Sequence, residues 1–266
     1  MNARNAVRMA APGLYQQLAR GRNIARLIGA IGRRELDFEM LEDVIKNAKG
    51  ISEKECSLCG FTGFFKAFGS PPRWDAQCPS CGSLERHRQL ALLLQNAPSI
   101  LDGKKVLHFA PEPCIAALLK KSDIKYTSAD LVRVDVDLNL DIENIAQNDE
   151  EYDIIVCSHV LEHVNDRRAL LELRRILKPD GTIIIMVPII EGCEISYEDD
   201  LIIDSKDRLV HFGQEDHVRV YGADFIQRLT GAGFQVRVHT AFGKEAVQLG
   251  LIMGEKIFLC SKADLK

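Results

Sequence analysis

The sequence predicts an α/β protein with a doubly wound sheet, preceded by a small zinc-ribbon module and a helical leader. Three observations predict this organisation. Short apolar runs alternate with helical segments from Lys104 almost to the end of the chain, two Cys-x-x-Cys pairs precede that region, and the first 34 residues carry seven arginines and no acid. We therefore expect a helical segment at 1–50, a zinc ribbon with its connecting helix at 51–100, and an α/β domain at 101–266.

Composition and charge are those of a globular protein. The 266 residues are 46% hydrophobic and 27% charged, and such a chain can hold one large domain and a small module. No run reaches 18 apolar residues, so we expect no membrane span. Residues 1–100 contain 14 Lys+Arg and 9 Asp+Glu, against 20 and 29 in the remainder. Because bound thiolates would remove part of the positive excess, charge is a weak indication of nucleic-acid binding.

The clearest α/β pattern lies at 152–188. Residues 154–157 form a continuous apolar run, which is typical of a parallel strand covered on both faces. The pair Asn165-Asp166 is placed to cap a helix with an apolar stripe. A Lys-Pro-Asp-Gly turn at 178–181 is expected to end that helix, and residues 182–187 to form a second buried strand. This pattern predicts one β–α–β unit.

A polar segment, Ser-His-Val-Leu-Glu-His, follows the first of these strands at 158–163. Open α/β sheets bind their ligands at this carboxyl end. His159 and His163 have the i, i+4 spacing of metal ligands on a helix. Glu162, however, stands beside the second histidine, and the sequence indicates no third ligand. We therefore expect no metal there.

Other elements follow from the same reading of periodicity. We expect strands at 106–110, 126–129, 135–140, 235–240 and 256–260, and helices at 37–48, 85–94, 115–121 and 223–232. The stretch at 191–221 is expected to be polar and irregular. Three interpretations of the arginine-rich start stay open, namely a packed or partner-binding helix, a frayed leader and an organelle transit peptide.

The cysteine spacing predicts a metal site. Cys56 and Cys59 form one pair, Cys78 and Cys81 the other, and 18 residues separate the pairs. This spacing fits a four-cysteine zinc site, which is structural because it leaves no open coordination position. Redox dithiol pairs and unrelated cysteines are the alternatives. No hydrophobic secretory segment precedes the pairs, so we expect a cytoplasmic location.

Aromatic residues lie between the two cysteine pairs. Such residues, interleaved with lysine and arginine, can stack nucleobases. More often they form the core of a small ribbon, and we favour that interpretation. The residues are Phe61, Phe64, Phe65, Phe68 and Trp74.

Two aspartates end predicted strands of the α/β domain. Asp130 stands 24 residues after Val106, where a carboxylate can bind both hydroxyls of a ribose. Asp141 has a similar place after the next strand. A cap or Asx-turn is the alternative for each. The first turn, Ala-Pro-Glu-Pro at 110–113, has no glycine, and its prolines remove N–H donors that a pyrophosphate needs. A phosphate-free cofactor suits it better, and Glu112 would then pair with an ammonium group unless it is a solvated turn residue.

Three segments carry a family resemblance, namely DIIVCSHVLEHV at 153–164, RRILKPDGTIIIMVP at 174–188 and HVRVYGADFIQRLTGAGFQV at 217–236. Over about 105–260 the chain resembles class I S-adenosylmethionine-dependent methyltransferases of the ubiquinone-biosynthesis and sugar-methyltransferase type. A CPSCGSLERHR ribbon ahead of an LHFAPEP strand also resembles a subgroup of bacterial methyltransferases.

The resemblance implies a seven-stranded Rossmann-like methyltransferase sheet that binds S-adenosylmethionine. It implies that Asp130 holds the ribose, and that Asp141 with Ile142 frames the adenine. Residues 108–112 would lie along the methionine moiety, and Ser158 and His159 near the transferred methyl. The family's acidic, glycine-rich first motif is replaced here by His108-Phe-Ala-Pro-Glu-Pro113. The cofactor candidates are His108, Ala110, Glu112, Asp130, Asp141, Ile142, Ser158 and His159.

In the resembling families the region around 211–221 faces the acceptor. A histidine that titrates near neutrality suits removal of a hydroxyl proton, so His211 and His217 are candidate bases beside His159. Asp216 or Glu215 is expected to orient an imidazole, and Arg219 to bind an acidic acceptor. The alternative for each histidine is a polar loop residue.

We therefore expect O-methylation of a small-molecule or saccharide-type acceptor, with one structural Zn²⁺ per chain. An RNA base methyltransferase that binds its substrate with the ribbon is one alternative. Base N-methyltransferases often carry an Asn/Asp-Pro-Pro-aromatic motif, which residues 157–159 do not match. The other alternative is a catalytically degenerate methyltransferase fold that serves as a binding module.

Overall fold

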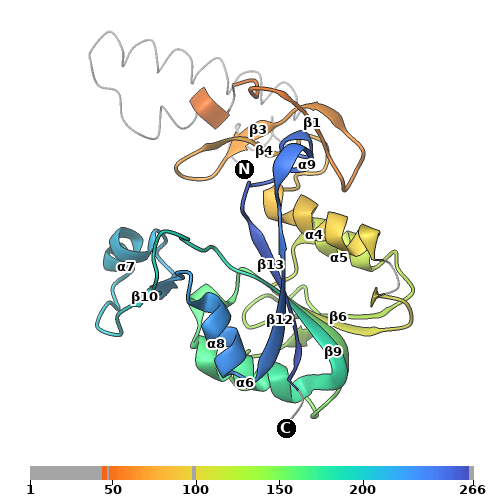
Figure 1. Ribbon diagram of the computed structural model, residues 1–266, viewed down its shortest axis with the longest axis vertical. Helices are drawn as coiled ribbons and strands as arrows, with labels where there is room; N and C mark the ends of the chain where they lie inside the picture. Colours follow the sequence, from red (N-terminus) through yellow and green to blue (C-terminus); the bar gives the residue numbers. More distant parts are fainter. Residues whose placement is uncertain (1–43, 47, 98–99, 264–266) are drawn as a thin grey trace, which may run out of the picture. The chain divides into compact units, whose positions relative to one another are not determined.

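The computed structural model describes residues 44–46, 48–97 and 100–263 (Figure 1). The chain divides into two compact units, the first made of the described residues up to Glu55 and of Phe61–Leu84, the second of Cys56–Gly60 and Glu85–Lys266. The arginine-rich start lies outside the described residues. So does most of the helix predicted at 37–48, of which 44–46 are helical.

The first unit contains two small hairpins. Strand β1 (Glu53–Glu55) pairs with β2 (Thr62–Phe64), and β3 (Lys66–Phe68) with β4 (Arg73–Gln77), both antiparallel. Phe65 is buried, and its ring centroid lies 6.1 Å from that of Phe61. Phe68 and Trp74 are exposed. The aromatic residues are therefore divided between a small core and the surface.

The second unit is built on a seven-stranded mixed sheet. Its strands β5 to β9 are parallel, whereas β13 runs antiparallel to both of its neighbours. This architecture confirms the predicted doubly wound α/β fold. The spatial order is β12 (Phe234–Thr240), β13 (Lys256–Lys262), β9 (Leu177–Met186), β8 (Tyr152–Ser158), β5 (Lys105–Phe109), β6 (Lys125–Asp130) and β7 (Leu138–Asn139).

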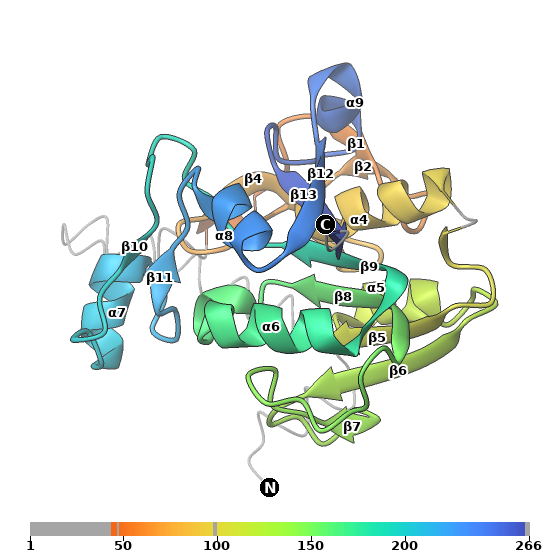
Figure 2. The same ribbon diagram turned by 60° about the horizontal axis from the view of Figure 1, so that its bottom comes forward.

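Helices cover both faces of this sheet (Figure 2). Ile154 and Val156 of β8 share a core cluster with α4 (Glu85–Asn96) and α5 (Pro113–Leu119). Ile155 and Cys157 instead share a cluster with α6 (Asp166–Ile176) and α8 (Phe225–Gly231). Successive side chains of a strand point to opposite faces, so a strand buried on both faces reads as an unbroken apolar run. The apolar run at 154–157 has this cause.

The β8–α6–β9 unit forms as predicted, with one correction at its second turn. The side chain of Asn165 caps α6 by accepting a hydrogen bond from the Arg168 amide at 3.2 Å. The predicted Lys-Pro-Asp-Gly turn is instead part of β9. Tyr152 pairs with Leu177 and Ile154 with Thr182, so β9 bulges outward over residues 178–181.

A second correction concerns residues 191–221, which are not irregular throughout. They contain β10 (Tyr197–Glu198), α7 (Ser205–Phe212) and β11 (Arg219–Val220), and β10 pairs with β11. Helix α7 buries only Phe212, so it lacks the apolar stripe that identifies a helix in a sequence. A short helix α9 (Gly243–Gln248) between β12 and β13 was also not predicted.

Two further observations complete the fold. The strand predicted at 135–140 is shorter in the structure, where only β7 forms. Helix α4 is fixed within the second unit by the buried guanidinium of Arg88, which donates to the carbonyls of Leu249 and Gly250. Across residues 44–46, 48–97 and 100–263, none of the helices has the length and apolar character needed to cross a membrane.

Candidate active site at the carboxyl ends of the strands

Backbone hydrogen bonds bring three of the predicted cofactor residues to one edge of the sheet. The Ala110 amide donates to the Ala129 carbonyl at 2.8 Å, and the Leu140 amide donates to the Asp130 carbonyl at 3.1 Å. The carboxyl ends of β5, β6 and β7 are thereby held side by side. Ala110, Asp130 and Asp141 stand at this edge, where open α/β sheets bind their ligands.

Glu112 is the centre of a buried polar cluster at the same edge. Its Oε1 accepts a hydrogen bond from Ser158 Oγ at 3.1 Å, and its Oε2 lies 3.3 Å from His108 Nε2. The other ring nitrogen of His108 lies 3.2 Å from the Tyr126 hydroxyl. A carboxylate can only accept, so His108 donates to Glu112 through Nε2. The cluster joins β5, β6 and β8.

The cluster keeps the Glu112 carboxyl group ionised. Burial opposes its ionisation, but hydrogen bonds from His108 and His87 outweigh that cost and hold the pKa of Glu112 well below its usual range. His87 Nε2 lies 3.4 Å from Glu112 Oε1, and burial lowers the pKa of this histidine. His87 is therefore buried against Glu112, and Glu112 is not the solvated turn residue that the sequence left as an alternative.

Two turns of the site carry left-handed backbone at residues that have a Cβ. Ala110, directly after β5, has φ +45°, and His159, directly after β8, has φ +54°. Such conformations cost about 1–2 kcal/mol for an L-residue, and they concentrate at functional sites. Sequence reasoning missed them because the residue expected at a positive φ is glycine.

Asp130 and Asp141 each use one carboxylate oxygen in a turn. Asp130 Oδ1 accepts from the amides of Val132 and Arg133 at 2.9 and 3.0 Å. Asp141 Oδ1 accepts from the Glu143 amide at 2.9 Å, and the next residue, Ile142, is buried. The turn-forming role is therefore present at both positions, and it engages Oδ1 of each side chain.

The two candidate bases in residues 211–221 differ in their surroundings. His211 is exposed on α7, and its Nδ1 lies 2.7 Å from the Tyr197 hydroxyl. His217 is buried, and its ring stacks edge-on with that of His163 at 4.7 Å between centroids. Burial lowers the pKa of His217, and the neighbouring His163 lowers it further. Asp216 lies beside His163, with 3.4 Å between Oδ2 and Nδ1.

Arg219 has a structural role. Its guanidinium donates to the carbonyls of Leu161 and Val164 and, at 2.9 Å, to Glu198 Oε2. The side chain is buried. It therefore clamps the turn after β8 to β11, and its binding of an acidic acceptor stays a prediction.

The structure gathers a different group of possible metal ligands at this turn, which includes His163 but not His159. Glu162, His163 and His217 each place a potential ligand atom within 4.8 Å of the others. The third member comes from the segment before β11, far along the chain. His159 instead contacts Glu162, with 3.1 Å between Nδ1 and Oε1.

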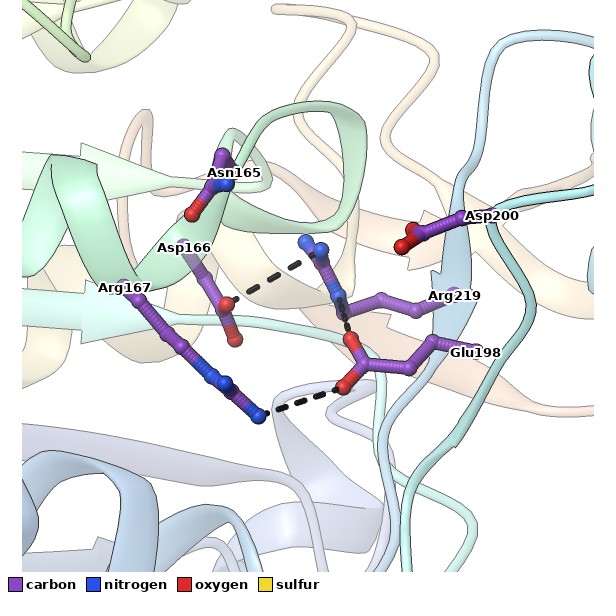
Figure 3. Close-up of a pocket in the computed structure, with 6 residues that line it drawn as sticks. All are labelled: Asn165, Asp166, Arg167, Glu198, Asp200 and Arg219. Carbon is purple, nitrogen blue, oxygen red and sulfur yellow. Dashed lines mark hydrogen bonds and ion pairs between the residues drawn. The ribbon is translucent and has the colours of Figure 1, made fainter.

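A polar hollow lies beside this turn (Figure 3). Figure 3 shows Glu198 between two guanidinium groups, and the distances are 2.9 Å to Arg219 and 3.9 Å to Arg167. A neighbouring pocket is lined by His163, Asp199 and Arg208 among others. The hollow is lined by Asn165, Asp166, Arg167, Glu198, Asp200 and Arg219. Such a lining suits a polar molecule.

The four predicted metal ligands converge. The sulfur atoms lie within 4.8 Å of one another, and they belong to Cys56, Cys59, Cys78 and Cys81. Tetrahedral Zn²⁺ with bonds of about 2.3 Å requires sulfurs about 3.8 Å apart, so the donor set fits this ion. Gly60 and Gly82 have φ +72° and +74°. Their amides donate to the carbonyls of Cys56 and Cys78 at 2.8 and 3.0 Å.

Comparison with known proteins identifies the domain. Residues 84–239 match the family model of the methyltransferase domain. Among solved structures, the [4+2]-cyclase SpnF has a TM-score of 0.50 and 14% identity, over 71% of this chain and 86% of that one. A 1,6-didemethyltoxoflavin-N1-methyltransferase of Burkholderia thailandensis, solved with S-adenosylhomocysteine, has a TM-score of 0.48 and 14% identity, over 67% of this chain and 78% of that one. At these identities the structures show the fold alone.

One curated relative shares a short segment. The uncharacterized protein MJ0638 of Methanocaldococcus jannaschii is 51% identical over 39 residues, which span 15% of this chain and 17% of that protein.

Proposed function

Because this chain belongs to the family of methyltransferase domains and is a methyltransferase, we propose that it transfers the methyl group of S-adenosylmethionine to an oxygen of a small-molecule or saccharide-type acceptor. The observation that carries the proposal is the ionised, half-buried Glu112 at the carboxyl ends of β5 and β8. A fixed carboxylate at this edge can pair with an ammonium group, which a nucleotide cofactor with a pyrophosphate does not offer.

The cofactor would be held by the residues that line the edge. In this proposal Glu112 binds the ammonium group of the methionine moiety, beside His108 and Ala110. Asp130 binds the ribose hydroxyls through Oδ2, since Oδ1 serves the turn. Asp141 and Ile142 frame the adenine. Ser158 ends β8 and His159 follows it directly, and both would lie beside the transferred methyl.

S-adenosylmethionine supplies an electrophilic methyl carbon on a sulfonium, so transfer to a hydroxyl leaves a neutral thioether and releases one proton. We assign removal of that proton to His159. Its Nδ1 faces the Glu162 carboxylate at 3.1 Å, which favours the tautomer with the proton on Nδ1. Its Nε2 is buried and lacks a hydrogen-bond partner within the described part of the chain. It is thus the nitrogen that would accept a proton. His211 and His217 are the other candidates.

The acceptor is proposed to be small and polar. The hollow beside the turn after β8 is lined by charged and amide side chains, which would hydrogen-bond a hydroxylated molecule. We further propose that the four cysteines hold one structural Zn²⁺, and that the division at residues 50 and 100 separates leader, ribbon and methyltransferase domain. A cytoplasmic location is part of the same proposal.

Calorimetry with S-adenosylhomocysteine, followed by methyl transfer to a panel of hydroxylated acceptors, tests the function. We expect binding of the cofactor product and transfer to at least one acceptor. His159→Gln should abolish turnover and leave S-adenosylhomocysteine affinity unchanged, whereas His239→Gln on β12 should preserve both. No binding at millimolar ligand would contradict the whole proposal. Transfer to RNA alone would contradict the acceptor class.

A further inference from the structure

We propose that Glu162, His163 and His217 form a binding site for one divalent first-row transition-metal ion. Each residue places a ligand atom within 4.8 Å of the other two. Ligands on one tetrahedral ion at about 2.1 Å lie about 3.4 Å apart, so side-chain movements of about 1 Å would complete the site. Two imidazoles with one carboxylate are a recurring set for zinc and non-haem iron.

An independent observation points to a missing cation. Glu162 is 1% exposed, and its Oε2 is buried without a hydrogen-bond partner among the residues that the structure describes. A buried carboxylate oxygen with nothing to accept is costly. Its Oε1 already faces His159. A cation between the three side chains would satisfy Oε2 and explain why an acid lies at this buried position.

Both histidines are already oriented by other groups. His163 Nδ1 faces the carbonyl and the carboxylate of Asp216, at 3.3 and 3.4 Å. His217 is buried, and its ring packs edge-on against that of His163 at 4.7 Å between centroids. In His163 one nitrogen is thus engaged, which leaves the other as the ligand. Metal-binding histidines are typically fixed in this way by an acceptor on the second nitrogen.

The backbone around the site is held by β11. The Val218 amide donates to the Glu162 carbonyl at 2.9 Å, and Tyr221 Oη donates to the Leu161 carbonyl at 3.0 Å. Together with Arg219, these groups donate hydrogen bonds to three carbonyls of the turn, those of Leu161, Glu162 and Val164. Backbone hydrogen bonds of the neighbouring residues therefore hold His217 beside Glu162 and His163.

Three protein ligands leave coordination positions open, as in catalytic metal sites. His163 lines the polar pocket beside the site, so an open position would face the region assigned above to the acceptor. An ion there would bind an acceptor oxygen and lower the pKa of its hydroxyl. This last step rests on the proposed methyl transfer, whereas the metal site itself does not.

The test uses the full chain with its cysteine site loaded with zinc, treated with a mild chelator and titrated with Mn²⁺ by electron paramagnetic resonance. Mn²⁺ suits carboxylate and imidazole ligands, whereas thiolates select zinc. We expect one Mn²⁺ per chain, and an affinity lowered about tenfold or more in Glu162→Gln and His217→Gln. His239→Gln, a histidine on β12, should bind like the wild type.

Circular dichroism and urea unfolding establish that each variant is folded. Equal Mn²⁺ affinity in the wild type and both ligand variants, or no Mn²⁺ bound by the wild type, would overturn the metal site. Because the titration contains neither cofactor nor acceptor, a failure of the proposed methyl transfer would leave its outcome unaffected.

Discussion

Ser158 Oγ donates a 3.1 Å hydrogen bond to Glu112 Oε1, and this bond joins the carboxyl end of β8 to the first residue before α5. Ser158 ends β8, whereas Glu112 lies in the turn after the neighbouring strand β5 and is distant from Ser158 in the sequence. With His108 they form a polar group that also contacts His87 and Tyr126. The ionisation state of Glu112 therefore affects the stability of the fold as well as the charge of the candidate site.

Replacement of Glu112 by glutamine should make stability less dependent on pH. The pKa of Glu112 is lowered on folding, so its stabilising contribution is present above its unfolded pKa of about 4.3 and is lost as the pH falls below that value. We expect Glu112→Gln to lower the free energy of unfolding by about 1–3 kcal/mol at neutral pH. The difference from wild type should narrow on acidification.

Urea unfolding at neutral pH and at about pH 3.5 measures both quantities. Glu245→Gln removes an exposed carboxylate from α9 and serves as the control. A destabilisation of Glu112→Gln that is the same at both pH values would mean that Glu112 acts through packing alone.

Two substitutions of Asp130 should separate its two roles. Asp130→Ala removes the acceptor for the amides of Val132 and Arg133, so it should lower both stability and cofactor affinity, each by about 1–3 kcal/mol. Asp130→Asn keeps an oxygen for the turn and removes the charge. It should have the melting temperature of the wild type but bind S-adenosylhomocysteine about tenfold more weakly than the wild type does. Wild-type affinity in Asp130→Asn would place the ribose elsewhere.

Ala110→Gly should stabilise the fold. Its backbone is left-handed at φ +45°, where glycine avoids the Cβ clash at a small cost in chain entropy. We expect the free energy of unfolding to rise by about 0.5–1 kcal/mol. The matched change Ala116→Gly in α5 should instead lower it by about 1 kcal/mol. A loss of stability in Ala110→Gly would show that the methyl group of Ala110 contributes packing that outweighs the strain.

The cysteine cluster predicts a difference in metal content between two cysteine variants. Cys78→Ser removes one of the four converging sulfurs, so this variant should contain one zinc ion fewer per chain than the wild type after the same chelator treatment. Cys193→Ser changes an exposed cysteine outside the cluster and should retain the ion. Elemental analysis of freshly purified, reduced protein measures both. Equal zinc in the two variants would exclude a four-cysteine site.

The sheet could be predicted from the sequence because its signals are local. Ile154 to Cys157 read as a two-sided strand, and Asn165 caps α6 as its residue type suggests. The turn predicted at residues 178–181 was wrong because proline and glycine occur in strand bulges as well as in turns, and the sequence does not distinguish the two. The bulge becomes visible only in the pairing with β8, where a Cβ on Gly181 would lie 2.9 Å from the Asp153 carbonyl oxygen.

The candidate site could be predicted only in part, because its contacts join distant segments. Asp130 and Ser158 were identifiable because each ends a strand. His217, by contrast, meets Glu162 through the pairing of β11 with the turn after β8, and nothing near His217 in the sequence indicates that partner. Arg219 looked like a ligand-binding residue because a sequence shows its charge but not the carbonyls of Leu161 and Val164 that it satisfies.

The pairing at the base of residues 190–220 has a consequence for how this protein can diversify. The Ile190 amide bonds to the Tyr221 carbonyl at 2.9 Å, and Tyr197 pairs with Val220, so the excursion between them leaves and rejoins the scaffold at one place. Its length can double for about 0.6 kcal/mol of additional loop-closure free energy. Exchange of residues 199–212 between related chains would therefore change the lining of the hollow, while the sheet and the carboxyl ends of β5, β6 and β7 keep their structure. Under the proposed function, such an exchange would change which acceptor is bound.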